Sequence, residues 1–197
     1  ECFYMNKLAF GPALRDAPLD VRYPPDVLVH TASRFLQRDP GVLTVCVLDR
    51  PRHGELIKGL RTTGCRIKLI KDCDITACIA TCFPDSGIDM YMGIGGAPEA
   101  VISAAAMKCM GGTIWAQEVV DSRLIDGSTD FCIPAPDKYI DMDTLAGGEV
   151  MFSATGITDG MLLKGVRYGP SGCPITSTLS MRSESGTVIR METEHGN

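Results

Sequence analysis

The segment 43–70 reads LTVCVLDRPRHGELIKGLRTTGCRIKLI, and its pattern decides the class of fold. Residues 43–48 form a continuous apolar run rich in β-branched side chains, which is typical of a strand buried on both faces. Pro51 then opens a stretch with helical spacing that Gly64 ends, in keeping with the preference of proline for the first helical turn and of glycine for the exit. Residues 66–70 predict a second strand.

The same alternation continues on both sides of this segment. A short helix is expected near residues 27–36, within an N-terminal region of strand or loop material. Further along the chain we expect a helix, a strand, a helix and a fourth strand at 75–83, 88–94, 98–110 and 113–117. Strands that alternate with helices predict an α/β fold in which a mostly parallel sheet is flanked by helices.

The C-terminal third has a different character. Residues 120–148 are polar and contain two prolines, so we predict a long irregular connection there. Residues 149–157 return to strand character. Polar and apolar side chains alternate in 175–182 and again in 187–191, which predicts a C-terminal β-hairpin.

Composition excludes several classes of protein. The chain has 197 residues, of which 45% are hydrophobic, and no apolar run approaches the ~20 residues that cross a bilayer. Its 19 basic and 24 acidic side chains give a net charge of −5, which argues against a general nucleic-acid binder. We therefore expect neither a nucleic-acid nor a membrane partner. None of its nine cysteines forms a C-x-x-C pair, which favours free thiols in a reducing compartment.

Basic side chains concentrate between residues 50 and 71, where seven of them are opposed by Glu55 alone. For Lys58 and Arg61 a solvated surface is the favoured interpretation. Arg50 and Arg52 differ, because they follow a buried strand at the edge where ligands bind in open α/β sheets. A guanidinium group pairs with phosphate through two hydrogen bonds, so the pair predicts a phosphate or oxyanion site. His53 either assists in binding the anion or is merely exposed.

Acidic side chains follow the second predicted strand. Asp72 and Asp74 flank Cys73 at its end. Asp74 is explained equally well as a cap of the following helix or, together with Asp72, as a holder of sugar hydroxyls or of a cation. The sequence pattern does not decide between these two roles of Asp74.

A glycine turn follows the third predicted strand. It is not a dinucleotide fingerprint, because the position of the third glycine is occupied by Pro98. The turn containing Gly96 instead opens a helix, whose free N–H groups favour an anion. Glu99 in the first helical turn either offsets the helix dipole or is a ligand for Mg²⁺ or Mn²⁺.

Because parallel strands expose their carboxyl ends at one edge, these three elements are expected to meet. Two arginines, two acids, a glycine-lined helix start and a metal-type carboxylate suit a phosphorylated polyol better than a nucleotide. The natural reaction class for such a site is metal-assisted phosphoester chemistry.

Five motifs in this order carry a resemblance to a known family: YMNKL at 4–8, LDRPRH at 48–53, MGIGGAPE at 92–99, ATGITDG at 154–160 and GVRY at 165–168. The series resembles the class II (bacterial-type) fructose-1,6-bisphosphatases, including the cyanobacterial forms that also accept sedoheptulose 1,7-bisphosphate. The likeness extends over nearly the whole chain.

The resemblance implies a sugar-phosphatase fold of alternating α and β layers, related to the inositol phosphatases. It implies hydrolysis of the 1-phosphate of fructose 1,6-bisphosphate, giving fructose 6-phosphate in gluconeogenesis or the Calvin cycle, with Mn²⁺ or Mg²⁺ as cofactor. It also implies a homo-oligomer in the complete enzyme. The expected compartment is the cytoplasm, with the plastid as the alternative.

Matching the family motifs residue by residue assigns a metal ligand, Glu99, and a set of substrate-binding residues: Tyr4, Arg50, Pro51, Arg52, Asp72, Cys73, Asp74 and Gly96. The chain departs from the family at Cys73, which stands where the family has the glycine of its D-G-D motif.

The remaining metal-binding acids of the family, and the residues that position the attacking water, lie in an N-terminal half. Residues 1–197 are therefore expected to be the C-terminal part of the enzyme, without that half and without its catalytic residues. The chain alone is expected to bind weakly and to turn over little. Two alternatives are a non-catalytic fragment or phosphosugar-binding module, and a phosphatase of the same scaffold acting on another substrate such as an inositol phosphate.

Overall fold

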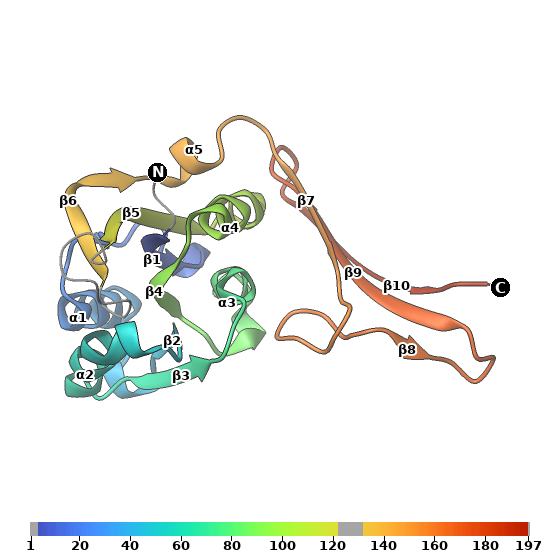
Figure 1. Ribbon diagram of the computed structural model, residues 1–197, viewed down its shortest axis with the longest axis horizontal. Helices are drawn as coiled ribbons and strands as arrows, with labels where there is room; N and C mark the ends of the chain where they lie inside the picture. Colours follow the sequence, from blue (N-terminus) through green and yellow to red (C-terminus); the bar gives the residue numbers. More distant parts are fainter. Residues whose placement is uncertain (1–3, 122–131, 197) are drawn as a thin grey trace.

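The computed structural model describes residues 4–121 and 132–196, which form a mixed sheet flanked by helices and a second, antiparallel sheet (Figure 1). The first sheet consists of β1 (Tyr4–Phe10), β2 (Thr44–Leu48), β3 (Arg66–Ile70), β4 (Met90–Gly96), β5 (Thr113–Asp121) and β6 (Cys132–Ile140). The second consists of β7 (Met151–Thr155), β8 (Arg167–Tyr168), β9 (Pro174–Arg182) and β10 (Thr187–Glu194). The α-helices are α1 (Pro25–Leu36), α2 (Gly54–Thr62), α3 (Asp74–Ala80), α4 (Ala97–Met110) and α5 (Met142–Leu145).

The six strands of the first sheet lie in the order β3-β2-β4-β1-β5-β6. β2 is parallel to both β3 and β4, as the βαβ pattern predicts. β1, however, lies between β4 and β5 and is antiparallel to both. The α/β class is thus confirmed, whereas the expectation of a mostly parallel sheet is wrong. β1 takes this central place because its residues Leu8, Ala9 and Phe10 are buried and fill the middle of the core.

The predicted irregular connection at 120–148 is also wrong in part, and residues 122–131 of it lie outside the described residues. β6 pairs with the end of β5, and α5 follows it. Because proline is rare in strands, the two prolines of this stretch led to the prediction of an irregular connection in place of β6. β6 tolerates them because it is the edge strand of the sheet, where a missing N–H leaves no ladder bond unmade.

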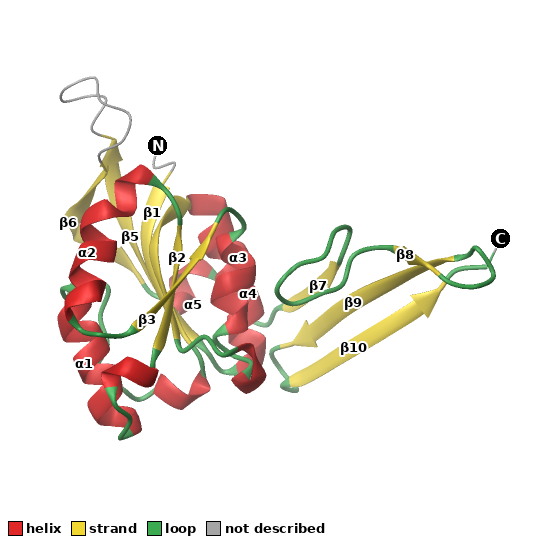
Figure 2. Ribbon diagram, turned by 90° about the horizontal axis from the view of Figure 1, so that it is seen from below, coloured by secondary structure: helices red, strands yellow, loops and turns green. Residues whose placement is uncertain are grey.

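Helices cover the two faces of the six-stranded sheet (Figure 2). α1 and α2 pack on one face, where Leu28, Val29 and Leu60 join the buried cluster around Val45 and Val47. α3 and α4 pack on the opposite face and contribute further buried side chains: Ala77, Cys78, Ala80, Ala104 and Met107. Burial on both faces explains why β2 reads as one continuous apolar run.

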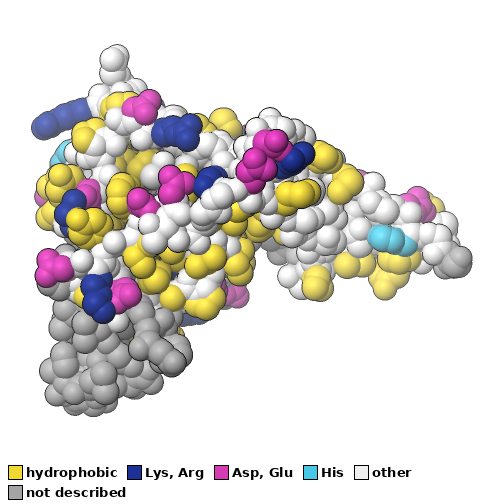
Figure 3. All heavy atoms as spheres, turned by 90° about the horizontal axis from the view of Figure 1, so that it is seen from above, with side chains coloured by type: hydrophobic (Ala, Val, Ile, Leu, Met, Phe, Trp, Pro, Cys, Tyr) yellow, Lys and Arg dark blue, Asp and Glu magenta, His cyan; other side chains and the backbone are white. Residues whose placement is uncertain are grey.

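The second sheet projects from this body (Figures 1 and 2). β9 and β10 form the predicted hairpin, with Thr187 opposite Arg182. Leu179 and Met181 of β9 attach the sheet to the body, since they pack in one buried cluster with Ala106 and Cys109 of α4. The space-filling view in Figure 3 shows apolar side chains on the projecting sheet, and charges of both signs interspersed over the body.

Within the two described ranges, none of the helices is both long and apolar enough to cross a membrane. Seven cysteines of the described part of the chain are free. Five of them, Cys46, Cys65, Cys78, Cys82 and Cys109, are buried, and burial raises the pKa of the Cys46 thiol to about 11. A thiol buried in apolar surroundings is shielded from reagents, so these five act as small apolar side chains.

Candidate functional site

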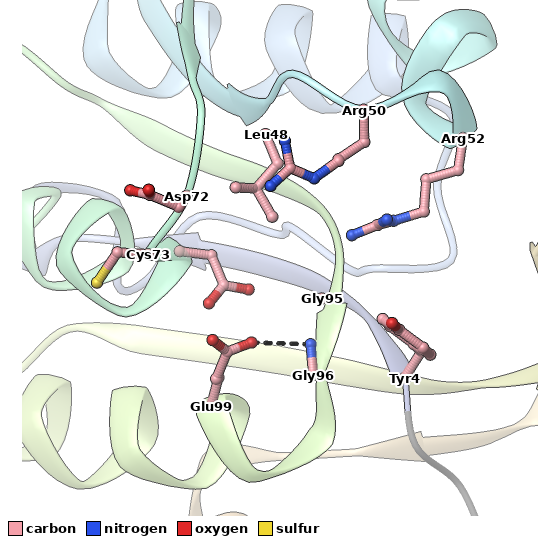
Figure 4. Close-up of a pocket in the computed structure, with 10 residues that line it drawn as sticks. Tyr4, Leu48, Arg50, Arg52, Asp72, Cys73, Gly95, Gly96 and Glu99 are labelled. Atoms are coloured by element: carbon pink, nitrogen blue, oxygen red, sulfur yellow. Dashed lines mark hydrogen bonds between the residues drawn. The ribbon is translucent and has the colours of Figure 1, made fainter. Parts of the chain in front are cut away.

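The carboxyl ends of β2, β3 and β4 meet at one edge of the sheet, beside the start of β1, where Tyr4 is paired with Gly96. A pocket of about 660 Å³ lies at this edge (Figure 4). Ten residues line it: Tyr4, Leu48, Arg50, Arg52, Asp72, Cys73, Asp74, Gly95, Gly96 and Glu99.

Eight of the nine residues singled out from the sequence are therefore brought together in one pocket. The ninth, Pro51, is not among the lining residues; it begins the 3-10 turn η3 (Pro51–His53), which contains Arg52 and directly follows Arg50. Leu48 and Gly95 complete the wall and were not anticipated, because an apolar strand end and a glycine carry no chemical signal of their own.

The two arginines lie on one side of the pocket, on the connection from β2 to α2 (Figure 4). The fork of Arg52 donates from Nε and Nη2 to the carbonyl oxygen of Ile94, at 3.0 and 2.9 Å, and its guanidinium lies 5.4 Å from the centre of the Tyr4 ring. Arg50 is exposed and donates from Nη1 to the oxygen of Asp49 at 3.0 Å. Arg52 is thus fixed in place by β4, whereas Arg50 remains accessible to a ligand.

His53 is neither exposed nor an anion ligand, which corrects both interpretations of it. It is 1% exposed, its Nδ1 donates to the oxygen of Leu48, and its Nε2 accepts from the N–H of Ile94, both at 2.7 Å. Burial lowers the pKa of the imidazole, which favours the neutral form that these two bonds require. His53 fastens the end of β2 to β4 and so supports the turn that carries the arginines.

The acids face the arginines from the other side of the pocket, where Asp72 and Glu99 are labelled in Figure 4. The Glu99 carboxylate accepts a hydrogen bond from the N–H of Gly96 at 2.9 Å, and so caps the start of α4. A Cβ on Gly96 would lie 2.7 Å from Oε2 of Glu99, so this close approach depends on glycine.

Metal binding would need more than Glu99 provides. Its oxygens are of the type that Mg²⁺ and Mn²⁺ prefer. Over residues 4–121 and 132–196, however, no three side chains of His, Cys, Asp or Glu are grouped so that they could hold a metal ion. The described residues fit one donor of a metal site and not a complete one.

Cys73 joins β3 to α3 in a left-handed conformation, with φ 58° and ψ 66°. It is the N-cap of α3, yet its side chain makes no capping hydrogen bond. A side chain is disfavoured in this conformation, which glycine adopts freely. The backbone conformation at position 73 therefore suits glycine better than cysteine.

Asp74 does not cap α3, because its carboxylate is turned into the core. Its Oδ2 lies 2.7 Å from the Nζ of Lys7, with both side chains fully buried, and it also accepts a 3.4 Å hydrogen bond from the hydroxyl of Tyr91. Lys7 was missed in the sequence. A signal did exist: a lysine directly before the apolar residues 8–10 of a strand must find a buried acid as partner.

The fold and the pocket define an α/β protein in which arginine donors and carboxylate acceptors lie together at one edge of the sheet. The family described as "Bacterial fructose-1,6-bisphosphatase, glpX-encoded" matches residues 1–195, and the chain belongs to this family. The resemblance seen in the five sequence motifs is thereby confirmed.

Curated relatives agree with this assignment. The chain is 40% identical to the D-fructose 1,6-bisphosphatase class 2/sedoheptulose 1,7-bisphosphatase of Synechococcus sp. (strain JA-3-3Ab), over 98% of this chain and 59% of the relative. It is 41% identical to the protein of the same description from Synechococcus elongatus, again over 98% and 59%. The chain thus spans about three fifths of the length of the curated relatives that it matches.

Proposed function

We propose that this chain provides the phosphosugar-binding part of a metal-dependent phosphatase that hydrolyses the 1-phosphate of fructose 1,6-bisphosphate, and that the same site accepts sedoheptulose 1,7-bisphosphate. The observation that carries the proposal is the meeting of Tyr4, the two arginines, the acids and Gly96 in one pocket. Membership of the fructose-bisphosphatase family supports it.

Each side of the pocket has a distinct task in this proposal. Arg50, which is exposed and hydrogen-bonded to the oxygen of Asp49, pairs with a phosphate of the sugar. Arg52 adds positive charge beside it and holds the ring of Tyr4 in place. Asp72, exposed at the opposite wall, accepts hydrogen bonds from sugar hydroxyls. The positive and negative walls therefore orient a substrate that carries phosphate at its ends and hydroxyls between them.

Glu99 is the one residue of this pocket that we propose as a ligand for Mn²⁺ or Mg²⁺. When bound, such an ion polarises a phosphoryl oxygen and activates a water molecule. We propose that the other ligands, and the residues that position the water, lie in the part of the relatives that this chain does not span. The isolated chain is accordingly expected to bind the phosphosugar and to release little or no phosphate.

Two measurements test this proposal. Calorimetric titration of the chain with fructose 1,6-bisphosphate should show saturable binding, and binding weakened in Arg50→Met. Phosphate release is then measured with Mn²⁺ for a chimera that joins the N-terminal part of a Synechococcus relative to this chain. Hydrolysis by the chimera that is lost in Glu99→Gln is the expected result. Glu99→Gln is preferable to Glu99→Ala, because the amide oxygen still accepts from Gly96 and keeps the helix cap.

A second candidate function is phosphosugar binding without catalysis, which the lack of a metal-holding cluster among the described residues favours. A chimera that binds fructose 1,6-bisphosphate but releases no phosphate would support this function. A chain that binds no phosphosugar at all would contradict both. A panel that includes inositol phosphates tests the remaining alternative, a related phosphatase of different specificity.

A further inference from the structure

Beneath the pocket lies a buried polar cluster that the proposed roles leave unused. Lys7 and Asp74 form an ion pair at 2.7 Å, and both side chains are 0% exposed. Lys7 comes from the middle of β1 and Asp74 from the first position of α3, so the pair joins two elements far apart in the sequence. Burying two charges is costly, so this pair is not explained by its contribution to stability alone.

The two oxygens of Asp74 are in different situations. Oδ2 is taken by the ammonium of Lys7 and by the hydroxyl of Tyr91. Oδ1 is buried and has no hydrogen-bond partner among the described residues. A buried carboxylate oxygen without a donor is unfavourable, and a hydrogen bond from a ligand would remove that cost. Asp74 is itself one of the residues that line the pocket.

The backbone is shaped around this arrangement. A Cβ on Gly95 would lie 2.1 Å from Oδ2 of Asp74 and 3.1 Å from Nζ of Lys7. Only glycine at this position of β4 lets the ion pair lie directly beside the strand. The carboxylate is thus held between Lys7, Tyr91 and the Gly95 backbone, which leaves it little freedom to turn.

We propose that Lys7 is a positioning residue for the sugar part of the substrate: it neutralises and orients Asp74 so that Oδ1 accepts a hydrogen bond from a sugar hydroxyl. This inference rests on the proposed phosphosugar site and adds the group that the site recognises. It also resolves the alternatives left open for Asp74. A carboxylate whose charge is already balanced by an ammonium at 2.7 Å suits a neutral hydroxyl donor, whereas a metal cation there would be repelled by Lys7.

Two ligands separate recognition of hydroxyls from recognition of phosphate. Fructose 1,6-bisphosphate carries both groups, whereas butane-1,4-diol bisphosphate carries two phosphates and no free hydroxyl. The wild-type chain is titrated with each by calorimetry and is expected to bind the sugar bisphosphate more tightly. Lys7→Met should weaken binding of fructose 1,6-bisphosphate about tenfold, the worth of one hydrogen bond to a charged acceptor, and should leave the diol bisphosphate unchanged.

Two further variants complete the test. Lys68→Met is the matched control, since Lys68 is exposed on β3 and is not among the lining residues, and it should change neither affinity. If Lys7→Met fails to fold because Asp74 is left as an unpaired buried charge, Lys7→Met/Asp74→Leu removes both charges and also the acceptor oxygen, with an apolar side chain of similar size in each place. This double variant should bind fructose 1,6-bisphosphate more weakly and the diol bisphosphate as well as the wild type does. Mn²⁺ should change the ligand affinity of the double variant as much as it changes that of the wild type.

The outcomes are distinguishable. Equal weakening of both ligands, or unchanged binding of fructose 1,6-bisphosphate, would overturn the role of Lys7 while leaving the phosphosugar site intact. Loss of the Mn²⁺ effect in the double variant would identify Asp74 as a metal ligand and also overturn it. A wild-type chain that binds neither ligand, or does not prefer the sugar, would overturn the proposed site and this inference with it.

Discussion

Replacement of Cys73 by glycine should stabilise the protein, although it removes a side chain. Cys73 has φ 58° and is exposed, so its side chain buries little surface and forms no capping bond. A residue other than glycine in the left-handed region costs about 1–2 kcal/mol. Glycine also loses more conformational freedom on folding than other residues, and this entropy loss reduces the stabilisation by about 0.5–1 kcal/mol. The expected net gain in the free energy of unfolding is roughly 0.5–1 kcal/mol.

Thermal unfolding followed by circular dichroism measures this effect. For a chain of this size 1 kcal/mol corresponds to about 2–4 °C, so Tm should rise by about 1–4 °C. Lys71→Gly is the matched control, because Lys71 is exposed, lies two residues before Cys73 and does not have a positive φ. Glycine there brings only the entropic cost, and Tm should fall.

A second position tests the same reasoning away from the pocket. Among the described residues other than glycine, positive φ occurs at Gln37 and Cys73 alone. Gln37 follows the last residue of α1 with φ 53°, so Gln37→Gly should also raise Tm. A fall in Tm for Cys73→Gly as large as that for Lys71→Gly would refute the account of backbone strain. Unchanged affinity for fructose 1,6-bisphosphate in Cys73→Gly would further show that the pocket needs the backbone here and not the thiol.

Three other predictions concern the surroundings of the pocket. Because burial lowers the pKa of His53 in the folded state, the unfolded chain takes up a proton first as the pH falls below about 6.5. The free energy of unfolding should then decrease by up to about 1.4 kcal/mol per pH unit as the pH falls, which urea denaturation at pH 7.5 and 5.5 measures. His53→Gln should show a smaller dependence on pH. An equal dependence in the variant and the wild type would contradict this role of His53. Arg52→Lys loses the two hydrogen bonds to the Ile94 oxygen, so it should lower the free energy of unfolding by about 1–2 kcal/mol, measured by urea denaturation. Arg50→Lys is the control and should change the free energy of unfolding by less than about 0.5 kcal/mol. Equal losses in the two variants would be the contrary result. Of the seven cysteines found free, Cys73 and Cys173 should react first with a thiol reagent, as followed by peptide mass spectrometry, because the other five are buried; early labelling of Cys46 would argue against the burial described.

Local pattern was sufficient for much of this fold. A continuous apolar run predicted β2, helical spacing between proline and glycine predicted α2 and α4, and period-two alternation predicted the C-terminal hairpin. Consecutive parallel strands end at one edge by geometry, so the meeting of Arg50, Asp72 and Glu99 followed from chain order alone.

Tertiary structure decided what depends on neighbours distant in sequence. No local period indicates that β1 inserts between β4 and β5, yet this insertion brings Tyr4 beside Gly96 and Lys7 into contact with Asp74. The buried state of His53 and the pairing of Asp74 with Lys7 arise in the same way, because a polar side chain's partner is set by which strand lies beside it. The sequence by itself determined the elements and the edge where the site forms. Only the packed structure decided which charges face a ligand and which are neutralised within the core, because strand order is a long-range property that local hydrophobic periodicity does not encode.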